Sequence, residues 1–200
     1  MRARPYGRCA CFFNRVFCAG AIAIFSLLIT AATLAGTMLA TPQEALPSPK
    51  AVVKSETFVS LDPVPRGKSF EIAVVVEIAK GFHMNSHKPT DFYLIATTIT
   101  PQTSAGFDIS DAIYPEGQME KFSFSPNKPL NVYTGKITLR IKATAHADAP
   151  LGAATIPLTL RYQACNDTTC LQPVKIPVDA RLVVASAGTK SRAIHPDLFA

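Results

Sequence analysis

The segment "ATIPLTLRYQACNDTTCLQPVKIPVDARLVV" (residues 154–184) contains two runs in which apolar and polar side chains alternate, and a short stretch with two cysteines separates them. Four apolar side chains share one face of the first run: Ile156, Leu158, Leu160 and Tyr162. The second run repeats the pattern with Val174, Ile176, Val178 and Leu182. Alternation with a period of two predicts strands that are buried on one face and solvated on the other, as in antiparallel sheets. We therefore expect a β-hairpin with Cys165 and Cys170 at its mouth.

The same period recurs along the rest of residues 52–185. The runs at residues 69–79 and 135–145 each place several apolar side chains on one face. Pro157 and Pro177 fall on outward faces, which predicts that their strands lie at edges or bulges. Turn-rich stretches separate the runs, and no long run has helical spacing. We predict an all-β, immunoglobulin-like antiparallel β-sandwich, without the buried tryptophan of antibody domains because the chain has no Trp.

The first 40 residues have the composition of an export signal. They contain four arginines and no acidic residue, and the run at residues 16–40 carries no charge. The apolar length of this run is greater than that of a typical signal peptide and approaches the roughly 20 residues needed to span a bilayer, so it serves either as a cleaved signal peptide or as an uncleaved membrane anchor. We expect an exported protein that contacts the membrane only through this segment. Residues 41–51 are expected to form a linker, and residues 186–200 a polar tail.

The charge balance of the exported part argues against binding to nucleic acid. Four of the twenty basic residues lie in the first 40 positions, whereas all fourteen acidic residues follow them. Residues 41–200 therefore carry sixteen basic and fourteen acidic side chains, a net charge of about +2. This charge is too small and too dispersed for an electrostatic footprint on a phosphate backbone.

Cys165 and Cys170 are the only cysteines after the N-terminal segment, and the residues allow three interpretations of the pair. Export to an oxidising compartment permits a disulfide, either as a structural staple or as a redox-active pair. Closing a loop of about six residues removes little chain entropy, worth about 2 kcal/mol, so a staple here constrains the fold only slightly. A local bond that contributes little to stability suits a dithiol that opens and closes, but the residues alone do not exclude a structural disulfide.

A metal site is the third interpretation. The sequence "HMNSH" (residues 83–87) supplies His83 and His87, which could join the two cysteines in a zinc or copper site. On a strand, positions four apart lie roughly 13 Å from each other, and Pro89 predicts a turn close by. We therefore expect no metal and no other cofactor.

Three segments resemble the N-terminal periplasmic domain of the DsbD family, the membrane thiol–disulfide reductases. The segment "YQACNDTTCLQPVKIPV" (162–178) resembles the family's cysteine segment and is the most specific of the three. The segments "GKSFEIAVVVEIAKGFHMNSHKPTDFYLIATTI" (67–99) and "AIYPEGQMEKFSF" (112–124) resemble blocks of its sandwich. The resemblance covers about residues 52–184, nearly all of the chain after the N-terminal segment.

The resemblance implies a domain that relays reducing equivalents in the periplasm. Cys165 and Cys170 would be its redox pair, and Cys170 would form the mixed disulfide with a partner. The expected partners are thioredoxin-like proteins or domains, such as disulfide isomerases. The sequence ends at Ala200 without the membrane and thioredoxin-like domains of the full family protein, so we expect a separate membrane electron transporter as the donor. The alternatives are a sandwich binding module with an inert disulfide and the metal-binding protein considered above.

The resemblance also implies residues that shield and tune the cysteine pair. A cap loop, here residues 117–124, would cover the pair with an aromatic side chain when no partner is bound. Phe122 is the first choice for this shield and Phe124 the second. His83 and Asn85 occupy strand positions beside the cysteines, where they would tune the thiols.

Overall fold

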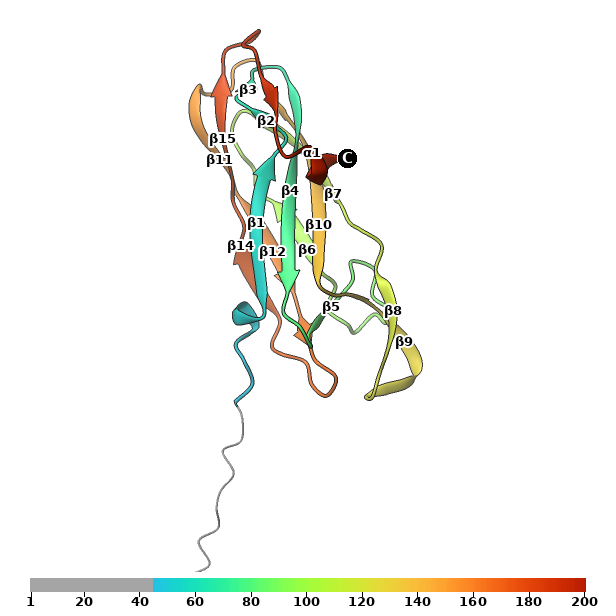
Figure 1. Cartoon of the computed structure of the whole chain (residues 1–200). Coiled ribbons are helices and arrows are strands. Elements are labelled where there is room, and N and C mark those ends of the chain that lie inside the picture. Colours follow the sequence, from blue (N-terminus) through green and yellow to red (C-terminus); the bar gives the residue numbers. More distant parts are fainter. Residues whose placement is uncertain (1–44) are drawn as a thin grey trace, which may run out of the picture. The chain divides into compact units, whose positions relative to one another are not determined.

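The computed structural model describes residues 45–200, which consist almost entirely of strands (Figure 1). The expected signal or anchor segment, residues 1–40, and the first four residues of the expected linker lie outside the described residues. The strands form several small sheets that stack as a sandwich. The prediction of an all-β, immunoglobulin-like sandwich is thus confirmed.

The first layer is a four-stranded antiparallel sheet in the spatial order β1, β4, β10 and β7. Its strands are β1 (Val53–Val59), β4 (Ser69–Ile78), β10 (Lys136–Ala145) and β7 (Phe107–Ile113). The alternating pattern in the sequence explains this layer, because the apolar face of β4 is buried from Phe70 to Ile78. Leu139 and Ile141 of the neighbouring β10 are fully buried beside it.

The second layer lies behind the first in Figure 1 and contains two three-stranded sheets. One sheet has the order β14 (Val174–Pro177), β12 (Leu158–Tyr162) and β6 (Thr98–Pro101). The other has the order β11 (Gly152–Ile156), β15 (Ala180–Ala185) and β3 (Val64–Pro65), with β15 and β3 parallel. Leu158, Leu160 and Tyr162 belong to the same core cluster as the inward residues of β4 and β10, so this cluster holds the two layers together.

The two runs of the quoted hairpin are each divided between these two sheets, which the sequence pattern does not predict. The expected strand at residues 154–164 becomes β11 and β12, separated at Pro157. The expected strand at residues 174–184 becomes β14 and β15, separated at Val178 and Asp179. Pro157 has no N–H to donate to a ladder, which accounts for the break between β11 and β12. The hairpin itself is confirmed, because β12 and β14 pair antiparallel from Thr159–Pro177 to Tyr162–Val174.

A smaller four-stranded sheet extends from one end of the sandwich and carries the cysteines. Its order is β13 (Ala164–Cys165), β5 (His83–Asn85), β9 (Ser125–Tyr133) and β8 (Gln118–Phe122). A separate apolar cluster of Phe122, Leu130 and Val132 supports the β8–β9 hairpin. This hairpin therefore packs on its own small cluster and not on the main core.

The ends of the described chain return to the sandwich. The 3₁₀ turn η1 (Pro49–Ala51) lies within the expected linker, and the carbonyl of Pro49 accepts a hydrogen bond from the buried Tyr162 hydroxyl at 3.0 Å. The segment that we expected to be a polar tail contributes β16 (Arg192–Ala193), which pairs with β2 (Leu61–Asp62), and the short helix α1 (Pro196–Phe199). In the part of the chain that the structure describes, no helix has the length and apolar character needed to cross a bilayer.

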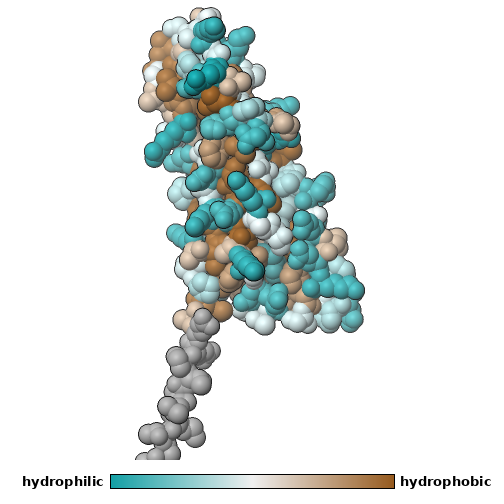
Figure 2. Space-filling view, viewed as in Figure 1, coloured by the Kyte–Doolittle hydropathy of each residue, from teal (hydrophilic) through white to brown (hydrophobic). Residues whose placement is uncertain are grey.

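The visible surface of the described domain is mixed in hydropathy (Figure 2). Figure 2 shows hydrophilic side chains dispersed over the visible face, with hydrophobic side chains between them. No single band of hydrophilic residues dominates this face.

Candidate functional site

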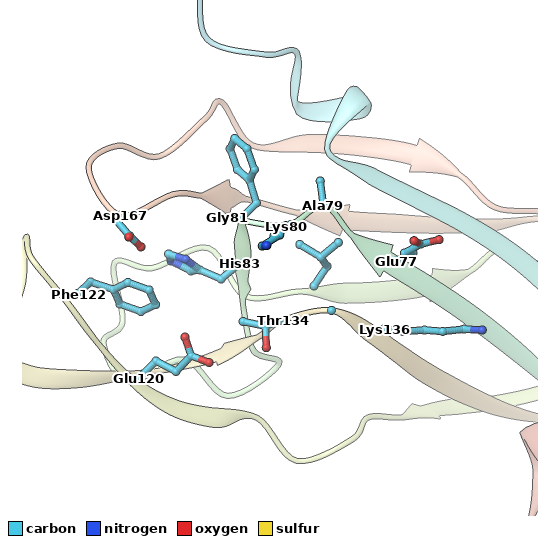
Figure 3. Close-up of a pocket in the computed structure, with 13 residues that line it drawn as sticks. Glu77, Ala79, Lys80, Gly81, His83, Glu120, Phe122, Thr134, Lys136 and Asp167 are labelled. Carbon is cyan, nitrogen blue, oxygen red and sulfur yellow. The ribbon is translucent and has the colours of Figure 1, made fainter.

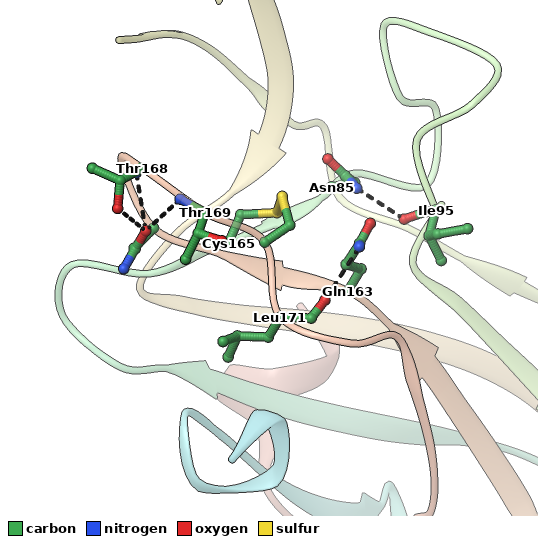
Figure 4. Close-up of a disulfide and its surroundings, with 9 residues drawn as sticks. Asn85, Ile95, Gln163, Cys165, Thr168, Thr169 and Leu171 are labelled. Atoms are coloured by element: carbon green, nitrogen blue, oxygen red, sulfur yellow. Dashed lines mark hydrogen bonds between the residues drawn. A yellow bond between two sulfur atoms is a disulfide. The ribbon is translucent and has the colours of Figure 1, made fainter. Parts of the chain in front are cut away.

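The two cysteines are bonded to each other at the mouth of the β12–β14 hairpin (Figure 4). Cys165 ends β13, and Cys170 lies opposite it as an isolated antiparallel bridge. Their Cα atoms are 3.9 Å apart. The sequence prediction that the hairpin brings this pair within bonding distance is therefore confirmed.

The loop between the cysteines is organised by its own hydrogen bonds. The Asn166 side-chain oxygen accepts hydrogen bonds from the backbone N–H groups of Thr168 and Thr169, at 3.0 and 2.8 Å, and from the Thr168 hydroxyl at 3.1 Å. This is the local turn that asparagine favours. The Leu171 N–H also donates to the Ala164 carbonyl at 2.8 Å, which closes the hairpin next to the pair. None of these bonds uses a sulfur atom, so they can hold the two cysteines close together after the disulfide opens.

The two cysteines differ in their access to solvent. Cys165 is only 1% exposed, whereas Cys170 is an exposed residue. Thiol–disulfide exchange requires a thiolate to reach a sulfur atom from outside along the bond axis. Only Cys170 offers such an approach to another protein. Cys165 is placed to react with Cys170 alone.

His83 lies directly opposite Cys165, because the two residues are register partners in the β5–β13 pair. Its side chain is 3% exposed, and its ring stacks on Phe122 with centroids 4.0 Å apart (Figure 3). Burial lowers the pKa of His83 from 6.5 to about 4, although the nearby Asp167 carboxylate acts in the opposite direction. His83 is therefore a neutral imidazole near pH 7.

The expected cap loop is the β8–β9 hairpin, and its tip contacts the cysteine loop. The Ser123 hydroxyl donates a hydrogen bond to the backbone carbonyl of Asp167 at 2.5 Å. Phe122 is buried and Phe124 is 45% exposed, with their rings nearly parallel and their centroids 5.4 Å apart. Phe122 thus covers His83, the cross-strand neighbour of Cys165. That Phe122 or Phe124 shields the disulfide itself remains a prediction.

Asn85 lies two residues further along β5 and is engaged elsewhere. It is 1% exposed, and its side-chain amide donates to the Ile95 carbonyl at 3.2 Å (Figure 4). Its own carbonyl accepts a hydrogen bond from the Thr97 hydroxyl at 2.6 Å. These bonds anchor the loop that follows β5. Its expected role in tuning the thiols stays a prediction.

The histidines considered for a metal site have separate surroundings. His87 stacks on Tyr114 with ring centroids 3.6 Å apart, and its Nδ1 lies 3.2 Å from the Thr97 carbonyl oxygen. His83 stacks instead on Phe122. Within residues 45–200, no group of three or more His, Cys, Asp or Glu side chains is arranged to hold a metal ion.

An open pocket of about 760 Å³ borders the site and includes residues that the sequence reasoning did not select. Glu120 and Asp167 line it together with His83 and Phe122 (Figure 3). Ser123 was missed as well, although it lies inside the expected cap segment. Its partner is 44 positions away in the sequence, so no local pattern could have identified the contact.

A known protein family matches most of the described chain. A family model described as "Thiol:disulfide interchange protein DsbD, N-terminal" matches residues 49–180, which include both cysteines. No curated protein matches the chain.

Two solved structures are similar to parts of the chain. The reduced DsbD N-terminal domain of Neisseria meningitidis is 18% identical, with a TM-score of 0.40, and the match covers 74% of this chain and 94% of that one. The N-terminal periplasmic domain of ScsB from Proteus mirabilis is 15% identical, with a TM-score of 0.43. That match covers 62% of this chain and spans 44% of the ScsB domain.

Proposed function

The chain belongs to the family of DsbD N-terminal domains, and we propose that it is an exported, periplasmic relay that passes reducing equivalents to partner proteins through a reversible Cys165–Cys170 disulfide. The family match spans residues 49–180 and so includes both cysteines. The immunoglobulin-like domain, residues 52–185, carries the redox pair, and residues 16–40 export the chain or anchor it to the inner membrane. No metal or organic cofactor takes part.

The unequal exposure of the two cysteines is the observation that carries this proposal. In the reduced form, the exposed Cys170 thiolate attacks one sulfur of a partner's disulfide and releases the partner's other sulfur as a thiolate. The buried Cys165 then attacks the Cys170 sulfur in the mixed disulfide. This second step forms the Cys165–Cys170 bond and releases the partner as a dithiol. Two electrons pass to the partner, and the relay becomes oxidised.

The β8–β9 hairpin acts as the cap in this scheme. Its tip is tied to the cysteine loop by the Ser123–Asp167 hydrogen bond, and Phe122 and Phe124 restrict the approach to the exposed Cys170 until a partner displaces them. A single exposed hydrogen bond contributes only about 1 kcal/mol, so displacing the tip costs little against the contacts that a partner protein gains.

The partners follow from the same chemistry. The acceptors are thioredoxin-like proteins or domains of the disulfide-isomerase type, which carry an exposed disulfide and an activated cysteine. The donor is a membrane electron transporter that returns the relay to its dithiol form.

Trapping of the mixed disulfide tests this function. The experiment uses the full chain with Cys9, Cys11 and Cys18 replaced by Ser, which we call the two-cysteine background. In this background, Cys165→Ala mixed with an oxidised thioredoxin-like protein should accumulate a mixed disulfide through Cys170, visible on a non-reducing gel. Cys170→Ala should trap much less, because the remaining cysteine, Cys165, is only 1% exposed.

The controls separate the relay from an inert disulfide. The variant with both Cys165→Ala and Cys170→Ala measures non-specific capture. If neither single-cysteine variant captures the partner above that level, the chain is a binding module with a structural bond and the relay is refuted.

A further inference from the structure

His83 lies where a proton acceptor for Cys165 would have to lie. The two residues are directly opposite each other in the antiparallel β5–β13 pair. Residues opposite each other in such a pair project from the same face of the sheet, with Cβ atoms about 4.5–5.5 Å apart. The imidazole of His83 and the sulfur of Cys165 therefore share one side of this small sheet.

The imidazole has a free nitrogen in a buried place. His83 is 3% exposed, and its Nε2 has no hydrogen-bond partner among the described residues. A buried polar atom without a partner is uncommon, because leaving it unsatisfied costs about 1–3 kcal/mol. An apolar residue at position 83 would avoid this cost. The position instead keeps an atom that can accept a proton.

The cap hairpin controls the surroundings of this nitrogen. Phe122 covers one face of the ring at a centroid distance of 4.0 Å, and Phe124 lies parallel to it at 6.5 Å. The charged groups that line the pocket together with the ring are Asp167 from the cysteine loop, Glu120 from β8 and Lys80 from the turn before β5. Glu77 and Lys136 line the far wall of the pocket (Figure 3).

We propose that His83 is the proton acceptor for Cys165 during resolution of the mixed disulfide, and that the Phe122 cap switches this capacity on when a partner displaces it. The inference rests on the relay function proposed above. While the cap is closed, the buried imidazole is a poor base and Cys165 keeps its proton. When the cap opens, water reaches the ring and its basicity returns.

The step balances as follows. In the mixed disulfide, Cys170 is bonded to the partner and Cys165 is a thiol. The His83 nitrogen takes the Cys165 proton, and the resulting thiolate attacks the Cys170 sulfur. The bond between Cys170 and the partner breaks, the partner's sulfur leaves as a thiolate, and it takes up the proton that His83 holds. The electron pair ends on the partner, and His83 is neutral again.

Opening of the cap raises the pKa of His83 when Cys165 needs a proton acceptor. Burial holds the pKa of His83 at about 4 in the closed form, against 6.5 for a solvated imidazole. General bases work best when their pKa lies near the working pH. Exposure by a partner therefore moves His83 into the useful range only when there is a mixed disulfide to resolve.

The test follows the two exchange steps separately with a chromogenic probe. Reduced protein in the two-cysteine background is mixed with dithiodipyridine, an aromatic disulfide that releases one coloured thiopyridone at each step. The first release reports attack by Cys170, and the second reports resolution by Cys165. Because this small probe does not displace the cap, the comparison is made in Phe122→Ala, in which the ring is uncovered. There we expect His83→Gln to slow the second release at pH 7 by about tenfold or more while the first changes little.

The pH profile and a matched control make the test specific. In Phe122→Ala the second release should bend where the uncovered His83 titrates, toward pH 6.5, whereas with the cap closed the bend should lie near pH 4. When His83→Gln is added, the release should rise steadily as Cys165 ionises unaided. His87→Gln removes a histidine that stacks on Tyr114 in the same way, and when added to Phe122→Ala it should leave the rate and profile unchanged. Equal rates and profiles in Phe122→Ala with and without His83→Gln, or an equal loss with His87→Gln, would overturn the proposal.

A second variant leaves His83 in place. Phe122→Ala uncovers the ring, so NMR titration should show the pKa of His83 rising from about 4 toward 6.5, and the bend in the second release should rise with it. A bend that stays where it was while the His83 pKa moves would contradict the proposal. Absence of any second release in wild type would instead refute the relay itself, so the two failures are distinguishable.

Discussion

The buried His83 should make the stability of the fold depend on pH in a window set by its two pKa values. The folded protein binds a proton on His83 only below about pH 4, whereas the unfolded chain does so below about pH 6.5. Between these values the unfolded state holds more protons, so the free energy of unfolding falls as the pH is lowered. Replacing His83 by Gln removes this titration and should flatten the dependence.

The expected size of the effect follows from the shift. A difference between 6.5 and about 4 corresponds to about 3 kcal/mol once the pH is below both values. By pH 5 the linkage relation gives a loss of about 2 kcal/mol relative to pH 7.5. A change of this size is a substantial part of the stability of an ordinary domain, about 5–15 kcal/mol.

Urea unfolding of the oxidised full chain at pH 7.5 and at pH 5 measures this loss. Other carboxylates contribute equally to all variants, so the comparison between variants isolates His83. Wild type and His87→Gln should lose about 2 kcal/mol more than His83→Gln over this interval. If His83→Gln shows the same loss as wild type, the buried neutral imidazole is refuted, and with it the environment that the β8–β9 cap is inferred to create.

Three further predictions concern the loop, the cap and the core. Reducing the disulfide should lower the free energy of unfolding by only about 2 kcal/mol, because it closes a loop of about six residues; urea unfolding with and without dithiothreitol measures this, and a loss of the whole fold would contradict it. Ser123→Ala removes the hydrogen bond from the cap tip to the Asp167 carbonyl, so the first release of thiopyridone should be about fivefold faster; an unchanged rate would show that the tip does not limit access. Tyr162→Phe removes the hydroxyl that donates to the Pro49 carbonyl, and it should cost about 1 kcal/mol in thermal or urea unfolding without changing either release of thiopyridone.

The sequence predicts the parts of this fold that local periodicity determines. The buried face of β4 from Phe70 to Ile78 and the pairing of β12 with β14 follow from alternation and spacing alone. The division of each hairpin arm between two sheets does not follow, because it depends on which strands lie alongside. Pro157 predicts a break in the strand, but the sequence does not predict that the chain changes sheets there.

The candidate site also has one part that the sequence predicts and another that it does not. The cysteine pair is visible in the sequence because its two members lie within one hairpin. The stacking of Phe122 on His83 and the bond from Ser123 to the cysteine loop join segments about 40 positions apart. Such contacts arise where the chain brings the β8–β9 hairpin, β5 and the cysteine loop together, so no local pattern encodes them. The family resemblance indicated Phe122 and His83 separately, and the structure brought them together.

The reduction potential of the Cys165–Cys170 pair tests the central claim most directly. The two-cysteine background would be equilibrated with dithiothreitol buffers of known ratio at pH 7, and the reduced fraction counted by thiol labelling and mass spectrometry. A relay should have a potential above about −300 mV, near or above the thioredoxin value of about −270 mV. A potential below about −300 mV would mark a bond that stays closed during the life of the protein, and would contradict the account.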